Sequence, residues 1–134
     1  MAPTILVVDD NSQTRTLIAR TLRPQGYEVT AAPDGKAALC AAAVQFPDLV
    51  IADVLLPGLN GLRVVDLLRR QDPLLPVIAI SAVHDVLQRP ELVPHALNPR
   101  SIAFLAKPFG LVALLALVHQ LLPHPPPVLT YSAR

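Results

Sequence analysis

The stretch Asp48-Leu49-Val50-Ile51-Ala52-Asp53 indicates the fold of this 134-residue chain. Its apolar centre is short, continuous and rich in β-branched side chains, a pattern typical of a strand buried on both faces of a parallel sheet. Two further runs of the same kind lie at Ile5–Val8 and Val77–Ile80. We therefore expect a parallel sheet that contains these three runs as buried strands.

Segments with helical spacing separate the runs. Two more strand candidates complete the series: Tyr27–Ala31 alternates between apolar and polar residues, as a strand nearer a sheet edge does, and Ile102–Leu105 comes last. The segments with helical spacing are Ser12–Leu22, Gly35–Val44, Leu62–Arg70 and Leu111–Leu122. This alternation predicts an α/β fold, with right-handed crossovers and a doubly wound parallel sheet.

Composition limits the class of protein. Apolar residues make up 52% of the chain and charged residues 16%, which predicts one compact domain and excludes disorder throughout. The net charge is +1 and the basic residues are scattered, so we expect no direct binding of nucleic acid or of a membrane. Cys40 is the single cysteine and no targeting segment is visible, both of which favour a cytoplasmic protein.

Proline is frequent, with 15 residues in the chain, and it is concentrated in two places. Pro90, Pro94 and Pro99 lie where a fourth helix is due, and four more prolines lie within 123–127. Because an interior proline removes a helical hydrogen bond, we expect the fourth helix to be irregular or shortened. We expect one domain over residues 1–122 and a proline-rich tail over residues 123–134.

The side chains that could carry chemistry follow the ends of the predicted strands: Asp9 and Asp10, then Asp53, then Ser81, and finally Lys107. Open parallel sheets bind ligands beyond the carboxyl ends of their strands. If the strand order is 2-1-3-4-5, the first and third strands are neighbours and the three carboxylates converge on one pocket. Such carboxylates repel one another unless a cation lies among them, and Mg²⁺ prefers oxygen ligands of this kind. With a hydroxyl and an ammonium nearby, the set suits transfer of a phosphoryl group onto a carboxylate.

Taken together and in order, these motifs resemble the receiver domain of two-component response regulators. The matching segments are Asp9-Asp10, Asp53 with Val54-Leu55-Leu56-Pro57-Gly58 and Gly61, Ser81-Ala82, and Lys107-Pro108-Phe109. The resemblance covers about Ile5–Leu122. It implies a flavodoxin-like receiver fold with five parallel strands in the order 2-1-3-4-5. It also implies a protein that is not an enzyme, apart from its own phosphotransfer and dephosphorylation.

The resemblance implies a phosphoacceptor and a metal site. Asp53 is the implied acceptor, and the donor is a sensor histidine kinase or a phosphotransfer protein. Asp10 and Asp53 would bind Mg²⁺ directly, and Asp9 would act mainly through water. The backbone carbonyl of Val54 would be a further ligand.

The resemblance also implies how the phosphoryl group is detected. Ser81 and Lys107 would contact that group, and Phe104 matches an aromatic side chain that changes position on activation. In the family, the fourth helix, the fifth strand and the last helix form the surface that reports phosphorylation. Because prolines interrupt the fourth helix here, we expect an unusual reporting surface.

The last helix, Leu111–Leu122, is apolar nearly all round, where a surface helix should have a polar face. We therefore expect it to be buried on more than one side. Two explanations remain open: it packs under the irregular segment of its own chain, or it forms a homodimer or binds a partner.

Two other functions remain as alternatives. One is a receiver-like module for interaction or dimerisation that no longer depends on phosphate, which the interrupted fourth helix and the apolar last helix favour. The intact acceptor residues count against it. The other is an Asp-nucleophile phosphohydrolase on the same fold. It is disfavoured because Leu55, two residues after Asp53, is not an acid that could protonate a leaving group.

Overall fold

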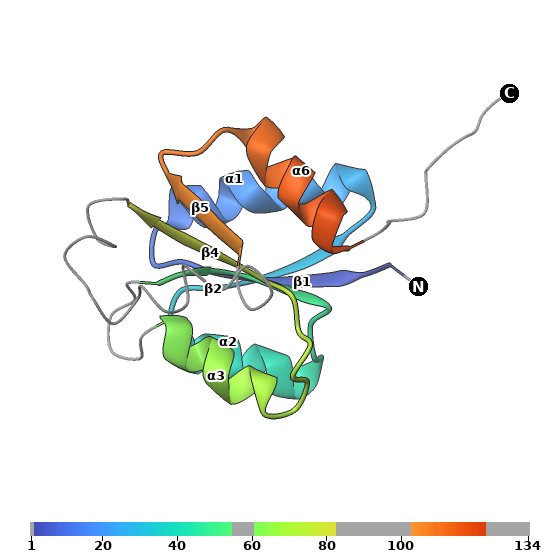
Figure 1. The fold of residues 1–134 in the computed structure, drawn as a ribbon, viewed down its shortest axis with the longest axis vertical. Coiled ribbons are helices and arrows are strands. Elements are labelled where there is room, and N and C mark those ends of the chain that lie inside the picture. Colours follow the sequence, from blue (N-terminus) through green and yellow to red (C-terminus); the bar gives the residue numbers. More distant parts are fainter. Residues whose placement is uncertain (1, 55–60, 83–102, 123–134) are drawn as a thin grey trace, which may run out of the picture.

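The computed structural model describes residues 2–54, 61–82 and 103–122, in which a five-stranded parallel sheet lies between two layers of helices (Figure 1). In chain order the elements are β1 (Thr4–Val8), α1 (Ser12–Leu22), the short 3-10 helix η1 (Arg23–Gln25), β2 (Glu28–Ala32), α2 (Gly35–Val44), β3 (Leu49–Asp53), α3 (Gly61–Arg69), β4 (Val77–Ala82), β5 (Ala103–Lys107) and α6 (Leu111–Leu121).

The strand order is β2-β1-β3-β4-β5, and all neighbouring strands are parallel. This confirms the predicted doubly wound sheet with order 2-1-3-4-5. Two strands are displaced from their predicted bounds. β2 begins at Glu28 and not at Tyr27, whose side chain is buried in the core. β5 runs on to Lys107, because the pairing with β4 continues to the end of that strand.

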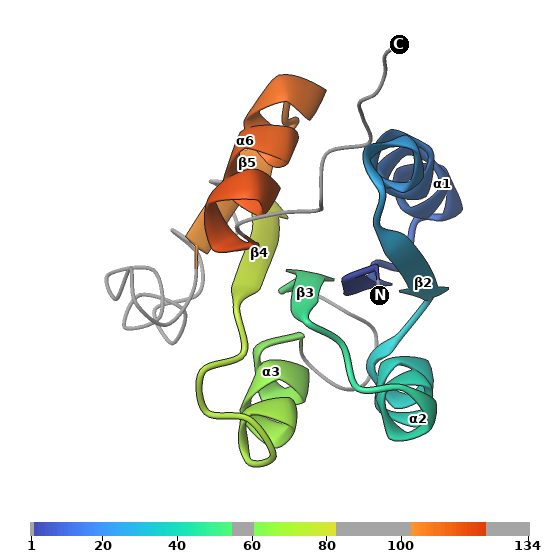
Figure 2. The ribbon, with the colours of Figure 1, turned by 90° about the vertical axis from the view of Figure 1, so that its right-hand side faces the viewer.

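Among the described elements, α1 and α6 cover one face of the sheet, and α2 and α3 cover the other (Figures 1 and 2). Strand side chains alternate between the two faces. In β3, Leu49 and Ile51 join the apolar cluster under α1 and α6, while Val50 and Ala52 join the cluster under α2 and α3. The central strands are therefore apolar throughout because they contribute to both cores.

Local signals set where the helices begin and end. The side chains of Asn11 and Asp34 accept hydrogen bonds from the backbone N–H groups of Thr14 and Ala37, which caps the starts of α1 and α2. After α1, the chain turns at Gly26, whose φ of 97° is readily adopted only by glycine. These caps orient the loops that leave β1 and β2 and so help to position the residues at the carboxyl ends of those strands.

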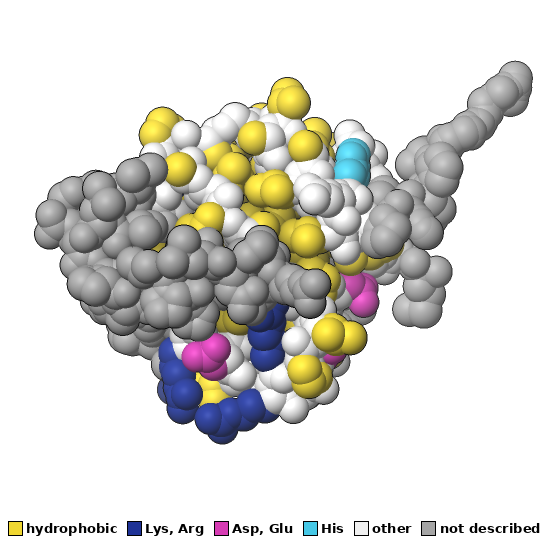
Figure 3. Space-filling view, viewed as in Figure 1, with side chains coloured by type: hydrophobic (Ala, Val, Ile, Leu, Met, Phe, Trp, Pro, Cys, Tyr) yellow, Lys and Arg dark blue, Asp and Glu magenta, His cyan; other side chains and the backbone are white. Residues whose placement is uncertain are grey.

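In the described residues of the single chain, α6 is buried on one side only. Of the two explanations for its apolar character, the irregular segment lies outside the described residues, and burial against a second copy or a partner stays a prediction. Leu114 and Val118 are buried against the sheet, but Val112 is 82% exposed and Leu111 is 36% exposed. A helix in an outer layer can turn only one side towards the sheet. Figure 3 shows hydrophobic side chains at the surface over this part of the molecule. The apolar composition of α6 therefore produces an exposed apolar face.

Two predicted regions, the irregular fourth helix and the tail 123–134, lie outside the described residues. In the parts of the chain that the structure describes, no helix has both the length and the apolar character that crossing a membrane requires.

Candidate functional site

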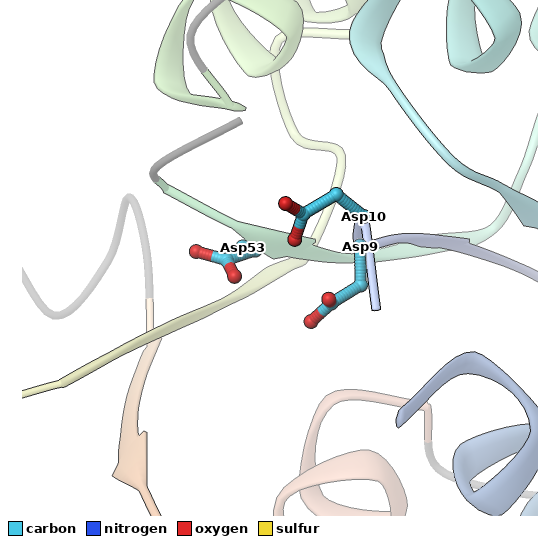
Figure 4. A group of neighbouring side chains, drawn as sticks. All are labelled: Asp9, Asp10 and Asp53. Carbon is cyan, nitrogen blue, oxygen red and sulfur yellow. The ribbon is translucent and has the colours of Figure 1, made fainter. Parts of the chain in front are cut away.

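Three carboxylates meet at the carboxyl ends of β1 and β3. Asp9 and Asp10 directly follow β1, and Asp53 is the last residue of β3. The two strands are neighbours, and their register pairs Val8 with Ala52, so both strands end at the same level of the sheet. Each carboxylate offers an oxygen within 4.8 Å of the others, and Figure 4 shows the three side chains next to one another. The structure therefore brings together the acids that the strand order was expected to unite.

The three acids differ in exposure. Asp9 is 1% exposed and Asp53 is 7% exposed, whereas Asp10 is open to solvent. Burial of a carboxylate is costly unless a cation or hydrogen-bond donors accompany it. The surroundings of Asp9 and Asp53 therefore determine whether the pocket can exist without a bound metal.

Lys107 supplies that cation from β5. Its Nζ donates a hydrogen bond of 2.7 Å to Asp53 Oδ2 and lies 3.2 Å from Asp9 Oδ2. Burial by itself would lower the pKa of Lys107, but the hydrogen bond and charge of Asp53, together with the charge of Asp9, outweigh it and raise this pKa. The ammonium is therefore a fixed positive charge between the two buried carboxylates.

Asp9 is held by contacts on three sides. Its Oδ1 accepts a hydrogen bond of 2.9 Å from the backbone N–H of Asn11, and its own N–H donates to the carbonyl of Ala32. Nη1 of Arg15 donates to the carbonyl of Asp9 at 2.7 Å. Sequence reasoning did not single out Arg15, because nothing in the sequence shows that a side chain on the first turn of α1 reaches back to β1.

One oxygen of the pocket has an incomplete environment. Asp9 Oδ2 is buried and accepts no hydrogen bond, and among the described residues its one charge partner is Lys107. A buried oxygen of this kind, beside two further carboxylates, can bind a hard cation or an ordered water molecule. The residues present therefore fit a divalent cation such as Mg²⁺.

The backbone after Asp53 is tightly packed. The carbonyl of Val54, a predicted metal ligand, accepts a hydrogen bond of 3.2 Å from the N–H of Gly61. A carbonyl oxygen has two lone pairs, so this bond leaves one free. A Cβ on Gly61 would lie 2.0 Å from the carbonyl oxygen of Asp53. The motif includes Gly61, but only the structure shows that a side chain there would collide with the backbone of Asp53.

The remaining predicted residues lie on β4 and β5. Ser81 is buried near the end of β4, the strand between those that carry Asp53 and Lys107. Phe104 lies on β5, three residues before Lys107, and packs partly buried against the cluster under α2 and α3. The arrangement thus combines three carboxylates, a fixed ammonium and a hydroxyl-bearing residue at one end of one sheet, a set that can supply a nucleophile and oxygen ligands for a cation.

Comparison with known families agrees with this geometry. Residues 5–119 match the response regulator receiver domain. Among curated relatives, the transcriptional regulatory protein PrrA of Mycobacterium tuberculosis is 39% identical over 121 residues, which is 90% of this chain and 50% of PrrA. The probable transcriptional regulatory protein TcrX of the same organism is 42% identical over 86 residues, 64% of this chain and 37% of TcrX. The chain thus spans half or less of the length of these relatives.

Solved structures show the same fold. The chemotaxis protein CheY4 of Vibrio cholerae aligns with a TM-score of 0.78 at 28% identity, and the alignment covers 91% of this chain and 100% of CheY4. The receiver domain of NtrX from Brucella abortus aligns with a TM-score of 0.75 at 33% identity, covering 89% of this chain and 98% of that domain.

Proposed function

Because the chain belongs to the response regulator receiver domain family, we propose that it accepts a phosphoryl group on Asp53 within a two-component relay. The donor in this proposal is a sensor histidine kinase or a phosphotransfer protein, which implies a cytoplasmic location. The observation that carries the proposal is the placement of the Asp53 carboxylate, 2.7 Å from the Lys107 ammonium and beside Asp9 and Asp10.

In the proposed transfer, a carboxylate oxygen of Asp53 forms a bond to phosphorus while the P–N bond of the donor phosphohistidine breaks. The donor imidazole leaves with the electron pair and takes up a proton from solvent. Lys107 moves its hydrogen bond from Asp53 to an oxygen of the phosphoryl group, where it balances the added charge. The Ser81 hydroxyl donates to another of these oxygens. The chain catalyses only this transfer and the later hydrolysis, in which a water oxygen bonds to phosphorus, the bond from phosphorus to the Asp53 oxygen breaks, and the Asp53 carboxylate and inorganic phosphate are released.

The same proposal assigns the oxygen ligands to Mg²⁺. Asp10 and Asp53 bind directly, Asp9 acts mainly through water, and the carbonyl of Val54 completes the protein ligands. Bound Mg²⁺ would neutralise the charge that accumulates between the carboxylates and the phosphoryl oxygens. The all-oxygen donor set and the Asp9 Oδ2 that lacks a hydrogen bond support this assignment.

The test is chemical phosphorylation. The protein is incubated with acetyl phosphate and Mg²⁺, and an acid-stable, base-labile modification is measured by intact mass. We expect the wild type to be modified and Asp53→Asn to remain unmodified. Asp66→Asn, an exposed acid on α3, is the matched control and should behave as wild type. Modification of Asp53→Asn at the wild-type level would show that Asp53 is not the acceptor.

The signal leaves the domain through protein contacts in this proposal, and Phe104 changes position when Asp53 is modified. The exposed side of α6 supports a contact with a second copy of the chain, because Val112 is exposed and α6 contains no Asp, Glu, Lys or Arg to repel its own copy. Sedimentation equilibrium should show a dimer that Val112→Glu disrupts and that Val44→Glu, equally exposed on α2, does not.

The same measurement separates the phosphate-dependent function from a module that works without phosphate. If phosphate controls the contact, dimerisation should increase after treatment with acetyl phosphate in the wild type and not in Asp53→Asn. Equal dimerisation of treated and untreated wild type would favour the phosphorylation-independent module.

A further inference from the structure

A concave surface lies between α1 and the edge strand β2, and none of the three pocket carboxylates lines it. Its volume is about 240 Å³. Most of its lining comes from two rows of residues spaced four apart, which run along α1 and reach the first residue of η1. We call it the α1–β2 groove and define it by Ser12, Arg15, Thr16, Arg20, Arg23 and Ala31.

The groove carries three guanidinium groups, two of which are anchored. Arg15 donates to the carbonyl of Asp9 at 2.7 Å, and Arg23 donates to the carbonyl of Val29 at 3.0 Å. Arg20 is exposed and makes no hydrogen bond or ion pair with the described part of the chain. Anchored guanidinium groups have lost part of their freedom already, so less entropy remains to be lost when they bind an anion.

No carboxylate of this surface balances these charges. The sequence of α1 contains neither Asp nor Glu, and in the described residues no acid forms an ion pair with the three arginines. Along β2, the side chains of Val29 and Ala31 lie on the face of the sheet that α1 covers. Because side chains alternate along a strand, Glu28 lies on the other face and does not reach the groove. An acid three or four residues from a basic residue on a helix would partly balance its charge, and α1 has none. The α1–β2 groove therefore has an uncompensated positive charge.

The chemistry and the size of the groove indicate carboxylate side chains as the ligand. Guanidinium groups bind carboxylates through paired hydrogen bonds, and the hydroxyls of Ser12 and Thr16 add further donors. The volume lies below the roughly 300–1,000 Å³ of sites that enclose a whole small molecule. Because β2 is an edge strand, an extended polypeptide can lie alongside it.

We propose that the α1–β2 groove binds an acidic segment of a partner protein. The segment places its carboxylates between Arg20, near the end of α1, and Arg23, at the start of η1, and against the hydroxyl of Thr16. This binding does not depend on the proposed phosphotransfer, because neither Arg20 nor Arg23 contacts Asp9, Asp10 or Asp53 in the described structure.

The experiment titrates the full chain with a ten-residue peptide of glutamate and with the same peptide made of glutamine. Binding is followed by backbone amide chemical shifts and by the change in affinity with salt. We expect the glutamate peptide to shift the amides of Thr16, Arg20 and Ala31, and we expect no binding of the glutamine peptide. Arg20→Glu should lower the affinity for the glutamate peptide about fivefold or more.

The matched control is Arg70→Glu, which makes the same charge change at an exposed position on the opposite side of the sheet. It should leave the affinity within about twofold of wild type. Equal weakening by both variants would mean that only net charge matters and would overturn the proposal. So would binding of inorganic phosphate or of a single-stranded oligonucleotide at this groove without binding of the glutamate peptide.

Discussion

In the pocket at the ends of β1 and β3, charged side chains are buried, whereas on the outer side of α6 apolar side chains are exposed. Asp9 and Asp53 are nearly inaccessible to solvent, and Val112 is almost fully accessible. In folded proteins charged side chains are usually exposed and large apolar side chains are usually buried, so the two regions depart from this rule in opposite directions. Burial of a carboxylate costs stability unless a cation or hydrogen-bond donors accompany it, whereas an apolar side chain that stays exposed gains nothing from folding.

The two regions differ in how much of that cost the chain itself offsets. In the pocket, Lys107 pairs with both buried carboxylates, and backbone groups hold Asp9 in place. On α6, Val112 is 82% exposed and Leu111 is 36% exposed. Burial of a charged group without a partner carries a large free-energy cost, whereas an apolar side chain can stay exposed to water in the folded chain at little cost. The pocket is therefore preorganised, and the α6 surface is open.

The largest effect that tests this comparison is expected within α6 itself. Leu114→Ala should lower the free energy of unfolding by about 2–5 kcal/mol, because Leu114 is fully buried. Val112→Ala should change it by no more than about 0.5 kcal/mol. Urea denaturation at low protein concentration measures both. A large loss in Val112→Ala would mean that the outer side of α6 is covered in the folded chain.

The next effect concerns the packing of the pocket. Gly61→Ala should cost about 1–3 kcal/mol of stability, because the added methyl group meets the backbone carbonyl of Asp53 and not a flexible side chain. The displaced Asp53 should also weaken Mg²⁺ binding, measured by isothermal titration calorimetry. Gly110→Ala is the control, since a Cβ there meets nothing within 4 Å. If both variants behave alike, the tight approach of Gly61 does not constrain the pocket.

A comparable or somewhat smaller effect should follow from removal of the cation. Lys107→Met leaves Asp9 and Asp53 without their ammonium and should destabilise the metal-free protein by about 1–3 kcal/mol. Mg²⁺ should restore more stability to this variant than to the wild type. Lys36→Met, at an exposed position on α2, should have little effect. Equal stability of the two variants would show that the pocket does not need its lysine.

The smallest effect is a dependence on pH. The pKa of Lys107 is raised, so its contribution is fully present below the ordinary lysine value of 10.5 and is lost as pH rises through the higher folded-state pKa. Burial also raises the pKa of Tyr27, and its ionisation destabilises the fold in the same alkaline range. Measurements should therefore use a Tyr27→Phe background, in which the Tyr27 contribution is absent, and Lys107→Met should then remove the Lys107 contribution.

Much of the fold could be predicted because parallel strands buried on both faces must be apolar throughout. Short apolar runs rich in β-branched residues, separated by segments with helical spacing, therefore identify the central strands. The positions of Asp9, Asp10, Asp53, Ser81 and Lys107 at strand ends followed from the same runs. Their functional roles stay predictions.

Other features depend on contacts between distant parts of the chain. The bond from Arg15 to Asp9, the approach of Gly61 to Asp53 and the bridging position of Lys107 could not be predicted from residue types. The outer side of α6 is a further case, since apolar composition alone does not say whether a second surface is present to cover it.

By itself, the sequence determined which segments are strands and helices and which acids follow the strands, because periodicity and local capping are properties of neighbouring residues. Only the tertiary structure decided that Lys107 pairs with Asp53 across 54 residues, that three arginines line one groove and that one side of α6 stays exposed. Those features depend on how the sheet and its two helical layers pack, which brings together side chains far apart in the chain.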